Sequence, residues 1–228
     1  MPTLDDPALE RLLDALHAQS DAQSAEMARF YAQRTLYTGP PSAEADAALK
    51  AFRRDKLVAL DRDKAEFVYL LCRSSNARRI VEAGTSHGVS TLYLAAAVRD
   101  NIRAGGGSGV VIGTEYEPEK ARIARAHFAR AGLDHLIDLR EGDLRQTLAR
   151  LDGPIDVMLV DIWVPMARPA LERVAPHLRP GALVLCDNTA EHRAAYADYL
   201  AFLGDPANGF RTMTLPFSGG LELSVRCA

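Results

Sequence analysis

The feature that most constrains the fold is a change of pattern near residue 79, where short β-rich runs begin to alternate with helical stretches. Five such runs occupy residues 79–83, 110–114, 136–139, 155–161 and 182–187. Helical stretches follow them at residues 91–102, 119–131, 143–151, 166–177 and 191–203. Continuously apolar runs, such as residues 157–160, indicate strands that are buried on both faces. The alternation therefore predicts an α/β fold with a doubly wound, mostly parallel sheet.

Both ends of the chain depart from this alternation. Helices are expected first, over residues 6–34, from Ser42, and over residues 61–75. At the other end, residues 210–215 and 221–227 flank Pro216-Phe217-Ser218-Gly219-Gly220, a hairpin spacing that makes the last strand antiparallel. We expect a seven-stranded sheet in a single domain of residues 1–228. Residues 1–60 would be a helical extension, and residues 61–228 would be a cofactor-binding core.

Apolar residues at three- and four-residue spacing mark the inner faces of the first helices. The residues concerned are Leu9, Leu12, Leu13 and Leu16 in the first helix, and Leu49 and Phe52 in the second. In the third helix, Phe67, Leu70 and Leu71 cluster. The leucine face of residues 9–16 lies outside the expected core. Since an amphipathic face outside the core needs a partner, it could pack against a second subunit, which favours a homodimer.

Composition excludes several classes of protein. The net charge of −3 comes with interleaved acids and bases, so no basic stripe predicts a nucleic-acid partner. No apolar run approaches the roughly 18–20 residues of a membrane-spanning helix. The acidic first thirty residues do not suit a signal peptide, and the three cysteines are far apart in the sequence. We expect a cytoplasmic protein that does not associate with membranes.

The carboxyl end of the first strand carries a turn suited to ligand binding, because ligands of doubly wound sheets bind beyond the strand ends. The strand ends in Glu82, and residues 84–88 lead into a helix. Glycines let a ligand approach the backbone, and free N–H groups at a helix start can hold a carboxylate. Taken alone, so short a motif fits an ordinary tight turn equally well.

Acids follow the next two strands as well. Glu115 ends the second strand and could accept hydrogen bonds from both hydroxyls of a ribose. Asp143 follows the third strand, where it could bind an adenine amino group or cap the next helix. Polar groups after three successive strands predict a nucleotide-like cofactor more strongly than any one of them does.

The fourth and fifth strands end in oxygen ligands. Asp161 closes the fourth strand, and Asp187 with Asn188 closes the fifth. Two carboxylates and an amide oxygen at adjacent strand ends could hold Mg²⁺ and leave positions for water and substrate oxygens. Alternatively, Asp187 caps the following helix and Asp161 orders a loop.

These residues together resemble the class I S-adenosylmethionine-dependent methyltransferases, and specifically the divalent-metal O-methyltransferases that include catechol O-methyltransferase. The resemblance covers about residues 60–190 and implies their Rossmann-like fold. The segment 81–90 resembles the cofactor motif of that family. The resemblance implies that Gly84 passes close to the methionine portion of the cofactor, and that Ser90, with the turn at Thr85 and Ser86, receives its carboxylate. Glu82 would support the ammonium side.

The resemblance extends to the later strand ends. Glu115-Tyr116-Glu117-Pro118 matches the ribose-binding acid, and Gly142-Asp143 matches the adenine-side turn. Val160-Asp161-Ile162-Trp163 matches the first metal-binding aspartate followed by a tryptophan near the cofactor, although Trp163 could instead be a core residue. Leu185-Cys186-Asp187-Asn188 matches the other two metal ligands. The resemblance thus implies S-adenosylmethionine and Mg²⁺, or another divalent cation, as cofactors.

One departure from the family concerns the acceptor. A lysine that helps deprotonate the attacking hydroxyl follows the tryptophan in catechol-type relatives, whereas Val164 stands here. We therefore expect O-methylation of a small-molecule hydroxyl, with the acceptor and the general base open. His192 could be a base or a solvated surface residue, and His87 is better suited to be a pocket wall. The wall of the acceptor site is expected from the N-terminal helices and residues 216–220.

Other functions remain alternatives. A metal-independent methyltransferase, or a non-catalytic cofactor-binding protein, would share the fold. An NAD-dependent oxidoreductase would want Gly-x-Gly-x-x-Gly and an acid about 20 residues later. Here Gly84 and Gly88 are separated by three residues, and Glu115 follows Gly84 by 31 residues (115 − 84).

Overall fold

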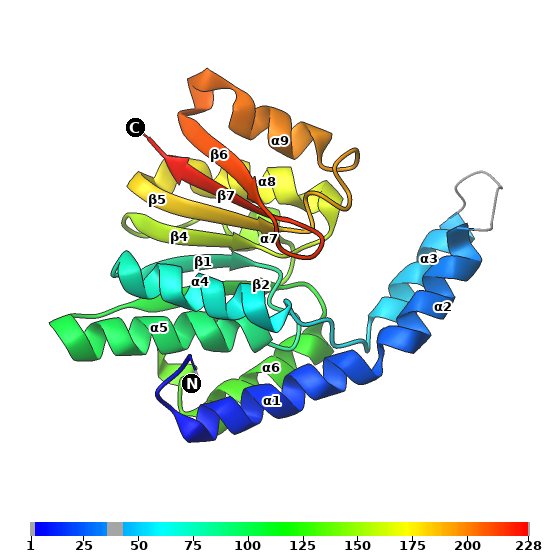
Figure 1. The fold of residues 1–228 in the computed structure, drawn as a ribbon, viewed down its shortest axis with the longest axis horizontal. Coiled ribbons are helices and arrows are strands. Elements are labelled where there is room, and N and C mark those ends of the chain that lie inside the picture. The colour runs from blue at the N-terminus through cyan, green and yellow to red at the C-terminus, as the bar shows by residue number, and fades with distance from the viewer. Residues whose placement is uncertain (1–2, 36–42, 228) are drawn as a thin grey trace. The chain divides into compact units, whose positions relative to one another are not determined.

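The computed structural model describes residues 3–35 and 43–227 and shows two compact units, Met1–Ala59 and Leu60–Ala228. Figure 1 shows the course of the chain, and each unit is treated separately below. Ser42, the expected start of the second helix, lies outside the described residues. Within the part of the chain that is described, no helix is long and apolar enough to span a bilayer.

The first unit is helical. It contains α1 (Pro7–Ala22), α2 (Ser24–Thr35) and α3 (Ala43–Arg53). The prediction of a single helix over residues 6–34 is wrong, because the helix is interrupted at Gln23. The Gln23 side chain hydrogen-bonds both backbone groups of Leu57, at 3.2 Å each, which is a contact distant in sequence that local periodicity cannot reveal.

The second unit is built on a seven-stranded sheet with the order β3-β2-β1-β4-β5-β7-β6. Its strands are β1 (Arg79–Ala83), β2 (Val110–Glu115), β3 (Ile137–Glu141), β4 (Ile155–Val160), β5 (Leu178–Asp187), β6 (Phe210–Leu215) and β7 (Leu221–Arg226). The first five strands pair in parallel, whereas β7 runs antiparallel to both β5 and β6. The predicted α/β fold with an antiparallel last strand is confirmed.

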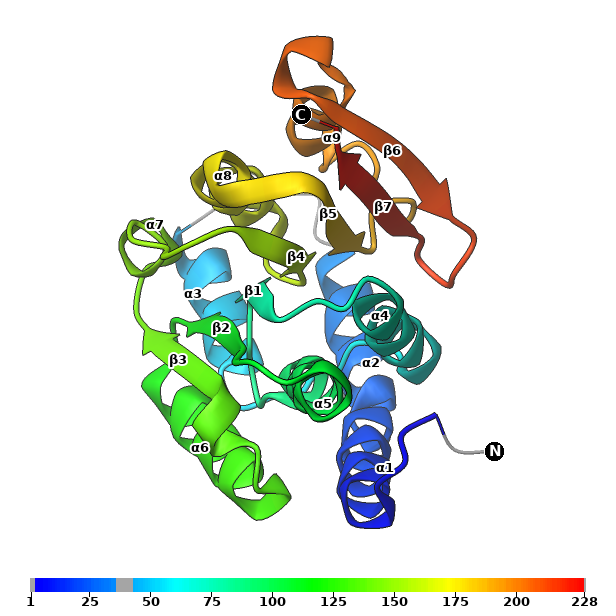
Figure 2. The same ribbon diagram turned by 90° about the vertical axis from the view of Figure 1, so that its left-hand side faces the viewer.

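Helices cover both faces of this sheet, with α4 and α5 on one face and α8 on the other (Figure 2). The helices of this unit are α4 (Arg62–Ser74), α5 (Val89–Gly105), α6 (Pro118–Ala131), α7 (Leu144–Thr147), α8 (Val164–Val174) and α9 (Ala197–Gly204). Two of them are shorter than expected, because α7 ends at Thr147 and the chain from Asn188 to Tyr196 forms turns before α9.

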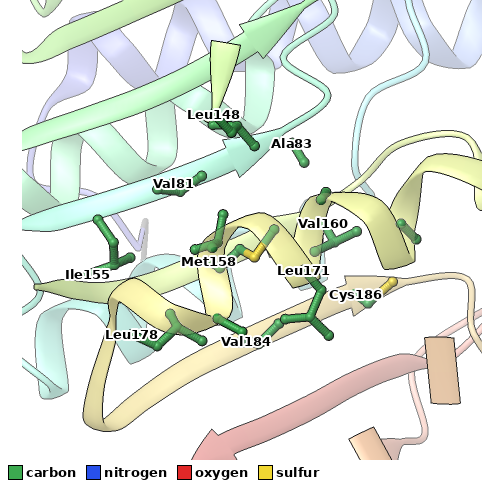
Figure 3. Close-up of a cluster of buried hydrophobic side chains, with 14 of the residues drawn as sticks. Val81, Ala83, Leu148, Ile155, Met158, Val160, Leu171, Leu178, Val184 and Cys186 are labelled. Atoms are coloured by element: carbon green, nitrogen blue, oxygen red, sulfur yellow. The ribbon is translucent and has the colours of Figure 1, made fainter. Parts of the chain in front are cut away.

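The core beneath α8 is formed by alternate residues of the central strands. Val81, Met158 and Val184 are fully buried and point towards the α8 side, where Leu171 meets them (Figure 3). Burying such a side chain contributes about 1.5–3 kcal/mol, so this layer fixes the central strands firmly. Their carboxyl ends are thereby held side by side.

The buried face of α4 does not consist of its cluster of large apolar side chains. Leu70, which belongs to that cluster, is 53% exposed. The face consists of Lys64, Ala65, Val68, Tyr69 and Cys72. The charged Lys64 can be buried there because it has a carboxylate partner.

Candidate functional site

The turn from β1 into α5 is shaped by two glycines that lie in the left-handed region. Gly84 has φ +100° and Gly88 has φ +84°. A Cβ at Gly84 would overlap the carbonyl oxygen of Asp161 and lie 2.9 Å from its carbonyl carbon, and one at Gly88 would overlap the Phe128 ring. The end of β1 therefore lies directly against the end of β4 at Gly84, and the turn lies against α6 at Gly88, so neither position has room for a side chain.

The buried Glu82 side chain anchors this turn through hydrogen bonds. Its carboxylate accepts hydrogen bonds from Thr85 Oγ1 at 2.9 Å, Ser90 Oγ at 2.7 Å and Thr91 Oγ1 at 2.5 Å. Burial raises the pKa of Glu82, while the three hydroxyl donors act in the opposite direction. The carboxylate thus fixes the turn and the first residues of α5 as one rigid piece. Ser90 is 5% exposed and Thr85 is 2% exposed, so both hydroxyls lie deep in the site.

Glu115 ties the end of β2 to the same turn. Its Oε2 accepts a hydrogen bond from the Ser86 amide at 2.7 Å, and its Oε1 accepts one from the Glu117 amide at 2.8 Å. Ser86 itself has φ +50°, and its hydroxyl accepts a hydrogen bond from Lys120 Nζ at 3.4 Å. Since each carboxylate oxygen has a second lone pair, Glu115 can still accept hydrogen bonds from a ligand.

Asp143 caps α7, which was one of its two expected roles. Its Oδ1 accepts a hydrogen bond from the Arg145 amide at 2.9 Å, and the Arg145 guanidinium pairs with the carboxylate. The guanidinium and the amide lower the pKa of Asp143 to about 2. This places an ionised carboxylate just after β3, next to the strand that ends in Glu115.

The ends of β4 and β5 bring two acids together. Val160 pairs with Cys186, so Asp161 and Asp187 follow neighbouring positions of adjacent strands. Burial, and then the charges of Asp187 and Glu82, raise the pKa of Asp161. Burial also raises the pKa of Asp187. Burial thus disfavours the charged forms of both acids, and a cation bound between them would favour those forms.

Asn188 completes the set of oxygen donors. It has φ +61°, and its Nδ2 donates to Asp187 Oδ2 at 2.8 Å. Its Oδ1 lies so close to Gly219 that a Cβ there would overlap it. Across residues 3–35 and 43–227, no three histidine, cysteine, aspartate or glutamate side chains are arranged to hold a metal ion. The set at β4 and β5 consists instead of two carboxylates and one amide.

Lys64 is a member of this site that the sequence pattern did not predict. From the first turn of α4, its Nζ lies 2.7 Å from Asp187 Oδ1 and 2.9 Å from Asp61 Oδ2. Burial by itself lowers the pKa of Lys64, but Asp187 and Asp61 together raise it, so the side chain is an ammonium. The available signal was its place in the helix, since Lys64 shares a face with Val68 and Cys72.

The remaining candidates lie at the start of α8 and after β5. Trp163 is 51% exposed, so the interpretation of Trp163 as a core residue is wrong. Val164 is the first residue of α8 and offers no amine. A hollow of about 420 Å³ beside it is lined from α8 and α9 and includes none of the predicted cofactor residues. His192 is exposed, and His87 is 4% exposed within the cofactor turn.

The topology and the acids at successive strand ends define a class I methyltransferase fold, and comparisons with known proteins agree. A family model described as a methyltransferase domain matches residues 81–189. A catechol O-methyltransferase of Mycobacterium tuberculosis is 30% identical over 155 residues, which are 68% of this chain and 67% of that protein. A catechol O-methyltransferase of Niastella koreensis is 30% identical over 135 residues, 58% of each chain.

A solved structure gives the same result. The crystal structure of cofactor-bound Rv0187 from MTB matches with a TM-score of 0.67 and 25% sequence identity, over 84% of this chain and 93% of that chain. The chain belongs to the S-adenosylmethionine-dependent O-methyltransferases, in the family that includes catechol O-methyltransferase.

Proposed function

We propose that the protein transfers the methyl group of S-adenosylmethionine to a hydroxyl of a small molecule, with a divalent cation bound beside the donor. The observation that carries the proposal is the convergence of strand ends at one turn. Gly84 lies against Asp161 of the β4 end, and the amide of Ser86 is bound by Glu115 of the β2 end. A cofactor lying over this turn would meet backbone amides, a ribose-binding acid and the proposed cation together.

Each side chain of the donor site has a distinct part in this proposal. The backbone amides of the turn and of Ser90 would hold the methionine carboxylate, and Glu82 would favour its ammonium group. Glu115 would accept hydrogen bonds from the ribose hydroxyls, which its free lone pairs allow. Asp143 would lie on the adenine side, and the half-exposed Trp163 would border the cofactor.

Methyl transfer is a direct displacement, so the protein contributes mainly by holding donor and acceptor in line. The residues that would hold a cation are Asp161, Asp187 and Asn188, which follow neighbouring positions of β4 and β5 and carry the hard oxygens that Mg²⁺ prefers. When bound, such a cation lowers the pKa of a coordinated hydroxyl. This chemistry would compensate for Val164, which cannot accept a proton.

The hairpin between β6 and β7 is hydrogen-bonded to the chain that follows β5, next to Asn188. The Asn188 amide donates to the Gly220 carbonyl at 3.0 Å, and the Ala190 amide donates to the Gly219 carbonyl at 3.0 Å. These bonds hold residues 216–220 against the end of β5. We therefore propose that this hairpin forms part of the wall of the acceptor site.

Binding of the donor can be tested by thermal unfolding. S-adenosylhomocysteine at about one hundred times its Kd should stabilise the folded protein by roughly 2.7 kcal/mol, because it binds only the folded state. NAD at the same concentration should leave the unfolding temperature unchanged. A shift with NAD and none with S-adenosylhomocysteine would favour the oxidoreductase alternative and would contradict the proposal.

The cation can be tested separately from the donor. We expect exhaustive EDTA treatment, or Asp187→Ala, to reduce methyl transfer to catechols and related phenols at least about tenfold, since metal-ligand and outer-shell changes cost this much or more. Added Mg²⁺ should restore the EDTA-treated protein but not the variant. Asp198→Ala, which removes an exposed acid of α9, is the matched control and should retain activity.

Two results would separate the remaining alternatives. Full activity in EDTA, together with full activity of Asp187→Ala, would indicate a metal-independent methyltransferase. Binding of S-adenosylhomocysteine without transfer to any phenol, acid or amine would indicate a non-catalytic cofactor-binding protein.

A further inference from the structure

Lys64 occupies an unusual place for a lysine, since its side chain is fully buried at the carboxyl ends of the central strands. Lysine is almost never fully buried unless it is paired. Here it is paired with Asp187, which is one of the residues proposed to bind the cation. Asp187 and Lys64 are separated by 123 residues in the sequence, so the contact is made by the fold and not by a local turn.

The two oxygens of Asp187 have different neighbours. Oδ1 lies 2.7 Å from Lys64 Nζ, and Oδ2 accepts a hydrogen bond from the side-chain Nδ2 of Asn188 at 2.8 Å. The ammonium therefore fixes the plane of the carboxylate from the α4 side. Lys64 Nζ also lies 2.9 Å from Asp61 Oδ2, and Asp61 is half exposed. The ammonium therefore connects a surface acid beside α4 to the buried Asp187.

The charge of Lys64 acts on any cation bound at the same acids. Lys64 offsets the negative charge of Asp187 at hydrogen-bond distance. A divalent cation held by Asp187 would lie near this ammonium, and like charges repel strongly where water is excluded. The lysine therefore stabilises the metal-free site and opposes occupation by a divalent ion.

We propose that Lys64 is a resident cation of this site, a positioning residue that orients Asp187 and keeps divalent-ion binding weak and reversible. This inference rests on the cation site proposed above and goes further, because it makes the metal-free protein a stable state. The site then holds one positive charge at all times and binds a divalent ion only weakly.

The test compares ion binding and stability in Lys64→Met with those of the unaltered protein. Titration calorimetry with Mg²⁺ or Mn²⁺ alone should show at least about tenfold tighter binding in the variant, because the opposing charge is gone. In EDTA the variant should unfold at a lower temperature, since Asp187 is left buried without its cation. Saturating Mg²⁺ should recover that loss, and it should raise the unfolding temperature of the unaltered protein much less.

Matched variants distinguish this role from that of an ordinary buried ion pair. Lys64→Arg keeps the charge and should bind ions as weakly as the unaltered protein. Lys64→Gln keeps a donor for Asp187 without the charge, and it should bind ions tightly even if Lys64→Met does not fold. Lys56→Met removes a lysine paired with Glu26 and Asp55 elsewhere and should change ion affinity in neither direction.

Ion affinity that is unchanged or weaker in both Lys64→Met and Lys64→Gln would overturn the proposal, as would absence of ion binding in every variant. Thermal shift with S-adenosylhomocysteine on the same proteins reports the donor site independently. A shift that persists in all of them leaves the proposed methyltransferase function standing whatever the ion titrations show.

Discussion

A Gly84→Ala variant should lose stability and cofactor binding together. The added Cβ would overlap the Asp161 carbonyl oxygen, and the residue would keep φ near +100°, where an L side chain is strained. Strain of this kind costs about 1–3 kcal/mol, and overpacking costs about 1–3 kcal/mol more. We expect urea unfolding to show a loss of about 2–6 kcal/mol, the sum of the two terms.

Gly132→Ala provides the matched control for this prediction. Gly132 has φ +67° at the end of α6, with no atom within 4 Å of an added Cβ. That variant should lose only about 1–2 kcal/mol, the cost of the left-handed conformation alone. It should bind S-adenosylhomocysteine normally, whereas Gly84→Ala should not bind it measurably in calorimetry. Equal losses in the two variants would show that the contact between the β1 and β4 ends does not matter.

The sequence predicted the sheet and most of the strand ends because both depend on local pattern. Buried parallel strands are continuously apolar, and the polar residue that ends each run is therefore visible in the sequence. In a parallel sheet those ends lie at one edge, so the sequence pattern alone groups Glu82, Glu115 and Asp161. The structure places them in contact with one turn, through the Ser86 amide and the backbone at Gly84.

Contacts between distant segments could not be predicted in this way. Lys64 pairs with a residue 123 positions away, and Gln23 breaks a helix because it binds Leu57. The buried face of α4 is a related case, since the large apolar Leu70 is exposed while Lys64 on the same helix is buried. Local periodicity records which residues are apolar, but not which of several faces another element will cover.

The site lacks a lysine at Val164 but has one at Lys64. Catechol-type relatives are expected to carry a lysine after the tryptophan, and this chain has none there. The fully buried Lys64 lies instead on α4, where its ammonium pairs with Asp187 and Asp61. Because Lys64 is buried and paired with these two acids, we assign it no part in deprotonating an attacking hydroxyl. In the proposed site its positive charge orients Asp187 and opposes binding of a divalent ion.

The Glu115→Ala variant should show the largest loss of donor affinity among substitutions that leave the fold intact. Glu115 is partly exposed at the end of β2, and truncation removes both proposed ribose contacts as well as the acceptor for the Ser86 amide. Hydrogen bonds to charged groups contribute about 1.5–3 kcal/mol each. Two of them correspond to roughly 3 kcal/mol or more, so the Kd for S-adenosylhomocysteine should rise about 100-fold or more.

Titration calorimetry with S-adenosylhomocysteine, comparing Glu115→Ala with Glu119→Ala, tests whether Glu115 binds the ribose. Glu119 lies four residues further on, is exposed, and pairs with Arg122 on the surface of α6. Its removal should change the Kd less than about twofold, because exposed ion pairs contribute little and Glu119 is not proposed to touch the ligand. If Glu115→Ala bound S-adenosylhomocysteine as well as Glu119→Ala does, Glu115 would serve only to tie the turn to β2. The donor would then have to be held by the turn amides and Glu82 alone.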